Sequence, residues 1–115
     1  MTEADARDLF PGALEMMVLQ LVTREPLHGY ALAQVIHQQS DEMLQIEDGS
    51  LYPALHRMTE QGWLKAEWGV TDTNRKARFY SITKRGRKQL AKETEEWQRI
   101  AGVIGRVLRL EGQKS

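Results

Sequence analysis

The side chains best suited to chemistry in this sequence gather on either side of the dipeptide Tyr52-Pro53. Ser50, Tyr52, His56 and Arg57 offer a hydroxyl, a phenol, an imidazole and a guanidinium. At the start of a helix, these groups and the free backbone N–H groups suit a phosphate and the edges of bases. An ordinary solvated helix face is the alternative, because polar outer faces are the rule for surface helices.

A second group of charged side chains lies between Arg75 and Lys88. This segment has seven basic residues and no acidic one, whereas residues 1–64 have three basic and ten acidic residues. The net charge of zero therefore hides an uneven distribution, which predicts a localised positive face. A solvated run of charges at a helix start is the alternative interpretation.

Other kinds of chemistry find little support. The chain has no cysteine, no nucleophile elbow, no phosphate-binding glycine loop and no His-Glu-x-x-His motif. His28, His37 and His56 are not spaced to form a metal-binding face on one helix. We therefore expect neither an enzyme nor a metal or cofactor site.

The amino terminus and the apolar segments indicate where the protein works. Residues 1–8 are acidic and lack the basic start and apolar run of a secretory signal. The most apolar window, residues 13–22, is about half the length of a membrane span and contains Glu15 and Gln20. We expect a cytoplasmic protein without a membrane segment.

Hydrophobic periodicity predicts three short helices in the first half of the chain. The first has an apolar face of Leu14, Met17, Val18, Leu21 and Val22 and ends before Pro26, and the second covers residues 30–36. Residues 43–46 are expected to form a small strand or an extended link. The third helix should begin near Ser50 as its N-cap, with Pro53 in the first turn, and end at Gly62.

The second half predicts a hairpin and a long helix. Residues 63–68 and 78–82 have the pattern of strands around a polar loop, 69–77. Thr83 is expected to cap a last helix that runs to Leu110. On this helix an apolar stripe, longer than three short helices can cover, predicts a homodimer; it includes Trp97, Ile100, Ala101, Ile104 and Leu108. The sequence does not explain Gly102 and Gly105.

This order of elements is that of a winged helix-turn-helix protein, an α+β fold that is mostly helical with a small hairpin. We expect a DNA-binding domain at 12–82, a dimerisation helix at 83–110, and tails at 1–11 and 111–115. Leu51, Leu55 and Met58 should face inward and leave Ser50, Tyr52, Pro53, His56 and Arg57 outside. Arg75, Lys76 and Arg78 on the hairpin would then contact phosphates or a minor groove.

Several motifs resemble the PadR family of bacterial transcriptional regulators. They are Pro26-Leu-His-Gly-Tyr30, Gly49-Ser-Leu-Tyr-Pro-Ala-Leu-His-Arg57, Gly62-Trp-Leu64, Glu67-Trp68, Arg75-Lys-Ala-Arg-Phe-Tyr80 and Thr83-Lys-Arg-Gly86. The resemblance covers roughly residues 12–110. It implies a winged-helix homodimer that represses promoters, with a C-terminal helix exchanged between subunits, in the compact branch of the family.

The same resemblance bears on a small-molecule effector. Some drug-responsive members of the compact branch place a tryptophan at the dimer interface, where it stacks on flat ligands, and Trp97 matches that position. An acidic residue that can face cationic ligands corresponds here to Ala101, so the effector stays open. Trp97 could equally pack the dimer interface and bind nothing.

Two functions therefore remain as expectations from the sequence. The first is a DNA-binding repressor that acts as a homodimer on a palindromic operator. The alternative is a winged helix that contacts other proteins without binding DNA. An apolar patch on the hairpin would favour the second function, and the basic residues there favour the first.

Overall fold

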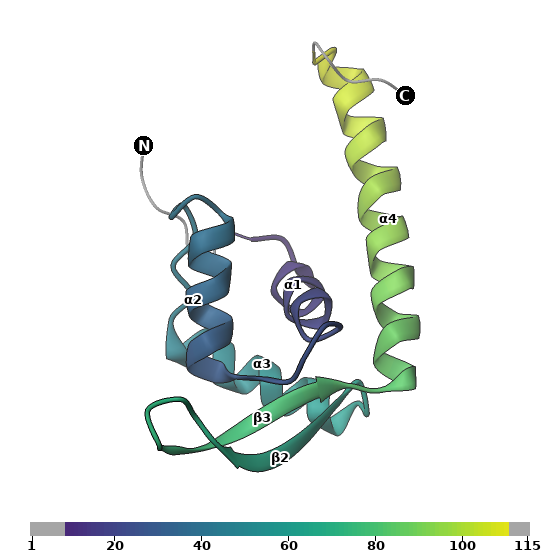
Figure 1. Cartoon of the computed structure of the whole chain (residues 1–115). Helices are drawn as coiled ribbons and strands as arrows, with labels where there is room; N and C mark the ends of the chain where they lie inside the picture. Colours follow the sequence, from purple (N-terminus) through teal and green to yellow (C-terminus); the bar gives the residue numbers. More distant parts are fainter. Residues whose placement is uncertain (1–8, 111–115) are drawn as a thin grey trace.

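The computed structural model describes residues 9–110. In Figure 1 the helices of the first half of the chain pack together, a hairpin lies along one end of them, and a long helix rises beside them. The elements in chain order are α1 (Ala13–Leu21), β1 (Leu27–His28), α2 (Gly29–Gln39), α3 (Asp48–Glu60), β2 (Leu64–Val70), β3 (Lys76–Ile82) and α4 (Lys84–Leu108). The predicted α+β winged-helix fold is confirmed, with one strand more than the sequence indicates.

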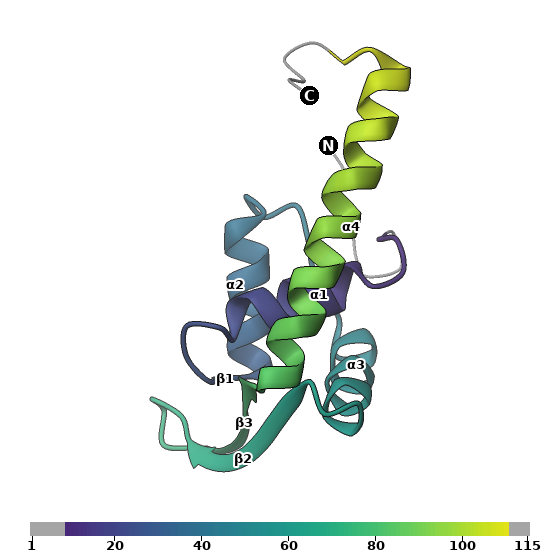
Figure 2. The ribbon, with the colours of Figure 1, turned by 90° about the vertical axis from the view of Figure 1, so that its right-hand side faces the viewer.

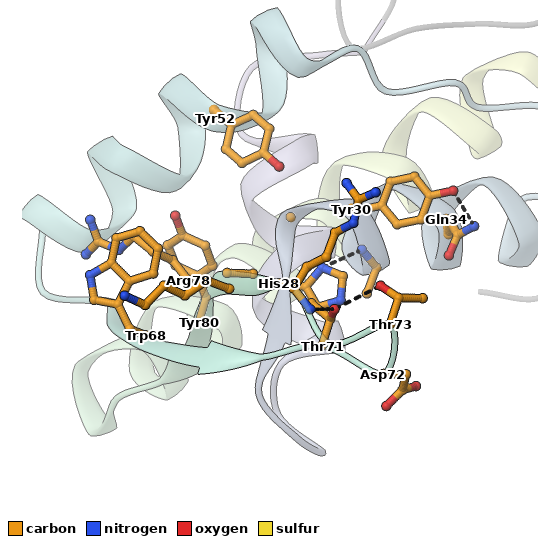
Figure 3. A pocket seen from close by; sticks show the side chains of 15 residues that line it. His28, Tyr30, Gln34, Tyr52, Trp68, Thr71, Asp72, Thr73, Arg78 and Tyr80 are labelled. Carbon is orange, nitrogen blue, oxygen red and sulfur yellow. Dashed lines mark hydrogen bonds between the residues drawn. The ribbon is translucent and has the colours of Figure 1, made fainter.

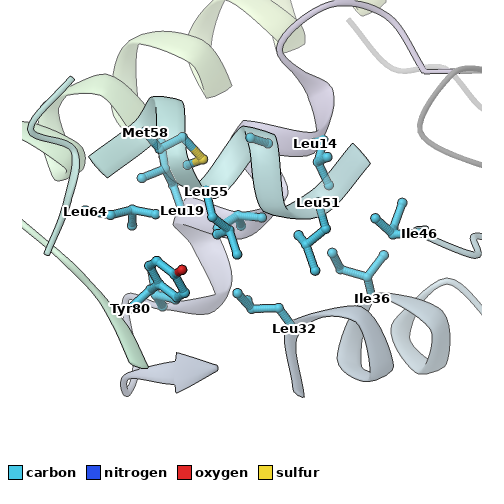
Figure 4. Packing of buried hydrophobic residues seen from close by; sticks show 13 residues of the cluster. Leu14, Leu19, Leu32, Ile36, Ile46, Leu51, Leu55, Met58, Leu64 and Tyr80 are labelled. Carbon is cyan, nitrogen blue, oxygen red and sulfur yellow. The ribbon is translucent and has the colours of Figure 1, made fainter. Parts of the chain in front are cut away.

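One hydrophobic core joins α1, α2, α3 and the base of the hairpin (Figure 4). Leu51, Leu55 and Met58 are completely buried, as their spacing on α3 predicts. Leu19 of α1 and Leu32 of α2 belong to the same buried cluster. Because burial of each such side chain stabilises the fold by about 1.5–3 kcal/mol, the inner face of α3 is fixed and the opposite face is left to solvent.

The start of α3 differs from the prediction. The helix begins at Asp48 after Glu47, and no side chain caps it, so Ser50 lies in the first turn and is not the N-cap. Pro53 is therefore one turn further inside, where it cannot donate to the carbonyl of Gly49. The acidic Asp48 fits the positive end of the helix, and Asp48 and Gly49 are already helical.

The hairpin is longer than predicted. Its ladder continues to the pair Val70–Lys76, so residues 69, 70, 76 and 77, which the sequence assigns to a loop, belong to strands. Thr71 and Arg75 close the turn, since the Thr71 N–H donates to the Arg75 carbonyl (2.8 Å) and the Thr71 hydroxyl accepts from the Arg75 N–H (3.1 Å). A rigid ladder thus carries the basic side chains away from the core.

A third strand, β1, was not predicted. Leu27 pairs with Tyr80 and His28 with Phe79, which gives an antiparallel sheet in the order β1-β3-β2. His28 also accepts the N–H of Ala31 at the start of α2. The predicted strand or link at 43–46 forms no strand, and Ile46 there packs into the core.

Thr83 joins α4 to the end of α3, and its predicted role as N-cap is confirmed. Its hydroxyl oxygen accepts from Gly86 N–H at 2.9 Å and lies 2.6 Å from the Gly62 carbonyl oxygen. Gly62, with a φ of 79°, follows the C-cap residue of α3, as predicted. Gly86 has no room for a side chain, because a Cβ there would overlap the carbonyl of Trp63.

α4 is longer than the body that it packs against. Figures 1 and 2 show α1 beside the lower half of α4, whereas the last turns of α4 extend past the other helices. The helix ends at Leu108, two residues before the predicted end, because Arg109 adopts a left-handed conformation. The predicted tails lie largely outside the described residues, which include only 9–11 of them.

Candidate nucleic-acid interface

The outer face of α3 presents polar side chains to solvent. Tyr52, Pro53, His56 and Arg57 are exposed, and Ser50 is half-buried. His56 and Glu60 lie one turn apart, with 3.5 Å between Nε2 and Oε2. This face has the polar groups that the sequence predicts there, but they do not all point the same way.

Arg57 and Tyr52 lie at opposite edges of α3. Arg57 reaches α1, where its Nη2 donates to Oε2 of Glu15 at 3.1 Å. Five residues of helix place two side chains about 140° apart, so Tyr52 lies on the other edge, toward the hairpin. No local pattern predicts this ion pair, because its partners are 42 positions apart in the sequence.

A groove of about 890 Å³ separates the hairpin from the N-terminal ends of α2 and α3 (Figure 3). Cations of the hairpin and aromatic rings from all three elements line it, and Asp72 is its one acidic lining residue. The lining residues of these two kinds are Arg75, Lys76, Arg78, Tyr30, Tyr52, Trp68 and Tyr80. The groove brings together Tyr52 and the three predicted cations of the hairpin.

Strand alternation places two of these cations on the groove side of the hairpin. Side chains two apart along a strand share a face, so Lys76 and Arg78 share the face of the buried Tyr80. Arg78 is paired across the strands with Trp68. The guanidinium carbon of Arg78 lies 5.8 Å from the centre of the indole ring, and Nζ of Lys76 lies 6.0 Å from it.

Tyr52 lies close to the start of α2. A Cβ at Gly29 would come within 2.5 Å of the phenolic oxygen, so the absence of a side chain at Gly29 makes room for the ring. Burial, with a smaller contribution from the charge of Asp48, raises the pKa of Tyr52 above its ordinary value. The phenol is therefore protonated at neutral pH and can donate a hydrogen bond.

The sequence did not single out Trp68 or Tyr30 as groove residues. The strand pattern predicted that Trp68 lies in a strand. It did not predict that the hydrophobic core ends before this position and leaves the indole exposed. Tyr30 lies near the start of α2, and its hydroxyl accepts from the side-chain amide of Gln34 at 3.1 Å. Both aromatic residues belong to motifs that carry the PadR resemblance, which is the signal that could have found them.

The predicted stripe on α4 is present as a mostly exposed apolar face. Ile100, Ile104 and Leu108 are exposed, Trp97 is 44% exposed, and Ala101 is half-buried. The ring of Phe10 lies against Trp97, with 6.4 Å between the ring centres. The stripe includes Ile104 and Leu108 in the last turns of α4, and Figure 2 shows that these turns pass beyond α1.

The described part of the chain has neither a metal site nor a membrane-spanning helix. Within residues 9–110, no three acidic or histidine side chains gather in a way that could hold a metal ion. No helix among the same residues has the length and apolar content needed to cross a bilayer.

Three helices, a hairpin with cations beside the third helix, and a long final helix define a winged helix-turn-helix protein. The model of the PadR-like family of transcriptional regulators matches residues 18–92, and the chain belongs to this family. The predicted family is thereby confirmed, and it is a family of regulators, not of enzymes.

Individual relatives agree with this assignment. The chain is 28% identical over 98 residues to the transcriptional regulator Rv3488 of Mycobacterium tuberculosis, which covers 85% of this chain and 88% of that protein. A transcriptional regulator from Clostridium thermocellum is similar in structure, with a TM-score of 0.76 and 28% identity over 83% of this chain and 92% of that one. A PadR family regulator from Eggerthella lenta is also similar in structure, with a TM-score of 0.73 and 31% sequence identity. The match covers 84% of this chain and 82% of that one.

Proposed function

We propose that this PadR-family regulator binds double-stranded DNA sequence-specifically, as a homodimer on a palindromic operator, and represses transcription. The observation that carries this proposal is the groove that has the edge of α3 on one side and the cations of the hairpin on the other. An α-helix fits the major groove, and a positively charged hairpin beside it fits the neighbouring phosphates or minor groove.

The two sides of the groove have different tasks in this proposal. Arg75, Lys76 and Arg78 neutralise phosphates and position the protein without reading the sequence. Base reading falls to α3, through Ser50, Tyr52, Pro53, His56 and Arg57. For Arg57 this task requires that it leave Glu15, a partner on α1.

The homodimer is proposed from the apolar face of α4. A second copy would cover Trp97, Ile100, Ala101, Ile104 and Leu108, which α1 leaves mostly exposed. In a two-fold dimer the two α3 helices face successive major grooves, so the half-sites lie about one helical turn apart. Residues 12–82 then form the DNA-binding domain and residues 83–110 the dimerisation helix.

Trp97 is also the candidate for a flat aromatic effector. Its ring is partly exposed and already has one aromatic neighbour, Phe10, so a planar molecule could stack in the same place. A planar dye such as acridine is expected to quench the tryptophan fluorescence and to weaken DNA binding. If the dye quenches the fluorescence of Trp97→Ala and weakens its DNA binding as it does for the parent protein, Trp97 is not the dye site and serves the dimer interface alone.

One observation favours the alternative function, a module that binds proteins. Trp68 and Val70 are exposed apolar side chains on the hairpin, where cations alone would be expected of a DNA-contacting wing. They lie next to Lys76 and Arg78, however, and a protein-binding patch is ordinarily depleted of charge at its centre. We therefore place DNA binding first.

A mobility-shift assay tests the proposal directly. The probes are a duplex from upstream of the protein's own gene and an unrelated duplex of equal length, each over a series of salt concentrations. We expect both to bind, with tighter binding of the first and an affinity that falls steeply with salt. Absence of binding to either duplex at low salt would contradict the proposal and favour the protein-binding module.

A further inference from the structure

Trp68 is a large aromatic side chain that the core does not cover. It shares a face of the hairpin with Leu64 and Tyr80, which are buried, yet it is 67% exposed. The strands continue past the edge of the core, and the indole therefore projects into the groove that Tyr52 also lines (Figure 3). A ligand in this groove would meet the indole.

The indole of Trp68 lies near two cations, Arg78 and Lys76, on the face of the hairpin that lines the groove. Arg78 lies directly across the ladder from Trp68, and Lys76 is paired with the next residue on that face, Val70. Their charged groups are 5.8 and 6.0 Å from the ring centre, a distance at which a cation is attracted to an aromatic ring. Among the described residues, neither cation forms an ion pair with a carboxylate.

The arrangement has the chemistry of one particular polymer. Two cations, each about 6 Å from the centre of the same flat apolar ring, match two phosphates with a sugar between them. The other side of the groove adds a phenol that donates a hydrogen bond, from Tyr52, and the lining contains a single acid, Asp72. A sugar–phosphate strand therefore complements the groove in both charge and polarity.

We propose that Trp68 is a DNA-contacting residue, with its indole packed on a deoxyribose while Arg78 and Lys76 hold the flanking phosphates. This inference rests on the proposed function and extends it, since it assigns one strand of the duplex to the groove between the hairpin and α3. The contact is independent of base sequence. Trp68 also acts as a positioning residue, because its ring attracts the charged ends of both cations.

The test compares Trp68→Ala and Trp68→Phe with the parent protein. Operator and unrelated duplexes of equal length are titrated by fluorescence anisotropy over a series of salt concentrations. Trp68→Ala should weaken binding to both duplexes equally, by about 10-fold, because it removes the sugar contact and frees the cations. The slope of log K against log salt should fall by roughly 1, the value of about one phosphate contact.

The controls separate this inference from the proposed function. Trp68→Phe keeps a ring for the cations and should restore most of the salt slope. Lys65→Ala, on the outer face of the same strand, should change affinity less than 2-fold although it also removes a charge. A melting curve for each variant reports folding, which an exposed site should not disturb.

Two results would overturn the inference, and they differ. If Arg78→Ala weakens DNA binding but Trp68→Ala changes neither affinity nor slope, the indole is not a DNA contact, and the proposed function stands. If the parent protein binds neither duplex, the proposed function and the inference fail together.

Discussion

Trp68 on the hairpin and Trp97 on α4 are both open to solvent, but their neighbours differ in kind. Trp68 lies within 6.0 Å of two cations, whereas Trp97 has the ring of Phe10 beside it and lies on an aliphatic stripe. A ring among cations suits an anionic polymer, and a ring among aliphatic groups suits another apolar surface. The charge of the neighbours thus indicates the partner better than the exposed ring does.

The two regions are also far apart in the fold. Figure 1 shows the hairpin at one end of the molecule and the last turns of α4 at the other. A change in one region should therefore act first on the partner of that region and leave the folding of the other region intact. This separation makes the comparison testable.

The largest effect is expected from a charge in the α4 stripe. Ile104→Glu places a carboxylate at the centre of the proposed dimer interface, so the protein should become monomeric. Operator affinity should then fall by more than about 100-fold, because two half-sites are no longer bound together. Light scattering after size exclusion gives the mass. Gln98→Glu, off the stripe, should leave the dimer intact, and a dimeric Ile104→Glu protein would assign the stripe to another partner.

A smaller loss is expected when the hairpin loses charge. Arg75→Ala combined with Lys76→Ala should weaken binding to operator and unrelated DNA alike, by about 20-fold at moderate salt. The salt slope should fall by roughly 2, about 0.9 for each phosphate contact. Titrations at several salt concentrations measure both quantities. An unchanged salt slope would show that the hairpin does not contact phosphates. The proposed difference between the partners of the hairpin and of α4 would then be wrong.

Arg57 tests whether the far edge of α3 belongs to the DNA interface. Arg57→Ala should reduce the preference for operator over unrelated DNA by about 10-fold, the value of one good base contact. Glu15→Gln releases Arg57 from its partner on α1 and should preserve that preference. If instead both variants only lower the melting temperature slightly, as expected for an exposed ion pair, Arg57 serves to link α3 to α1 and does not contact DNA.

Tyr52→Phe removes a single hydroxyl from the groove. Binding should weaken by about 5-fold, because one hydrogen bond contributes about 1 kcal/mol. The raised pKa of Tyr52 means that the phenol keeps its proton beyond its usual range near 10, so this contribution should persist from pH 7 to pH 9. It should be lost only above the raised pKa. Anisotropy titrations of both proteins over this pH range show whether the ratio stays constant.

The smallest effect concerns the side of α4 away from the stripe, because Gly102 lies about 140° around the helix from Trp97. A Cβ at Gly102 would meet one atom within 4 Å, a guanidinium nitrogen of Arg106 at 3.9 Å. Gly102→Ala should therefore stabilise the helix by up to about 1 kcal/mol, measured as a rise in melting temperature. If the variant loses stability or dissociates, the second copy approaches α4 at Gly102 as well as at the stripe.

The sequence predicted those features that depend on nearby residues. Thr83 caps α4 through the N–H of Gly86, three residues on, and Leu51, Leu55 and Met58 share a face because of helical spacing. Local patterns of this kind determine whether an element forms and which side faces inward. The predicted fold class and family were accordingly confirmed.

The features that were missed depend on residues distant in the chain. β1 is two residues long and exists because β3 pairs with it. The groove was missed as a unit, because the point where the core ends along β2 is decided by the packing of the three helices. Arg57 was predicted to face DNA freely, since nothing near it in sequence shows that Glu15 lies within reach.

The connection through Thr83 has a mechanical consequence. The first turn of α4 is attached to the residues that follow α3, because the Thr83 hydroxyl lies 2.6 Å from the carbonyl oxygen of Gly62 and Gly86 fits closely against the carbonyl of Trp63. With 25 residues, α4 is about 37 Å long. Its N-terminal end is fixed beside the C-terminal end of α3, the helix proposed to read DNA, so α4 can act as a lever. In a dimer, a small change in the angle at which two such levers cross would alter the spacing between the two α3 helices, so operator fit could be tuned from the far end of the molecule.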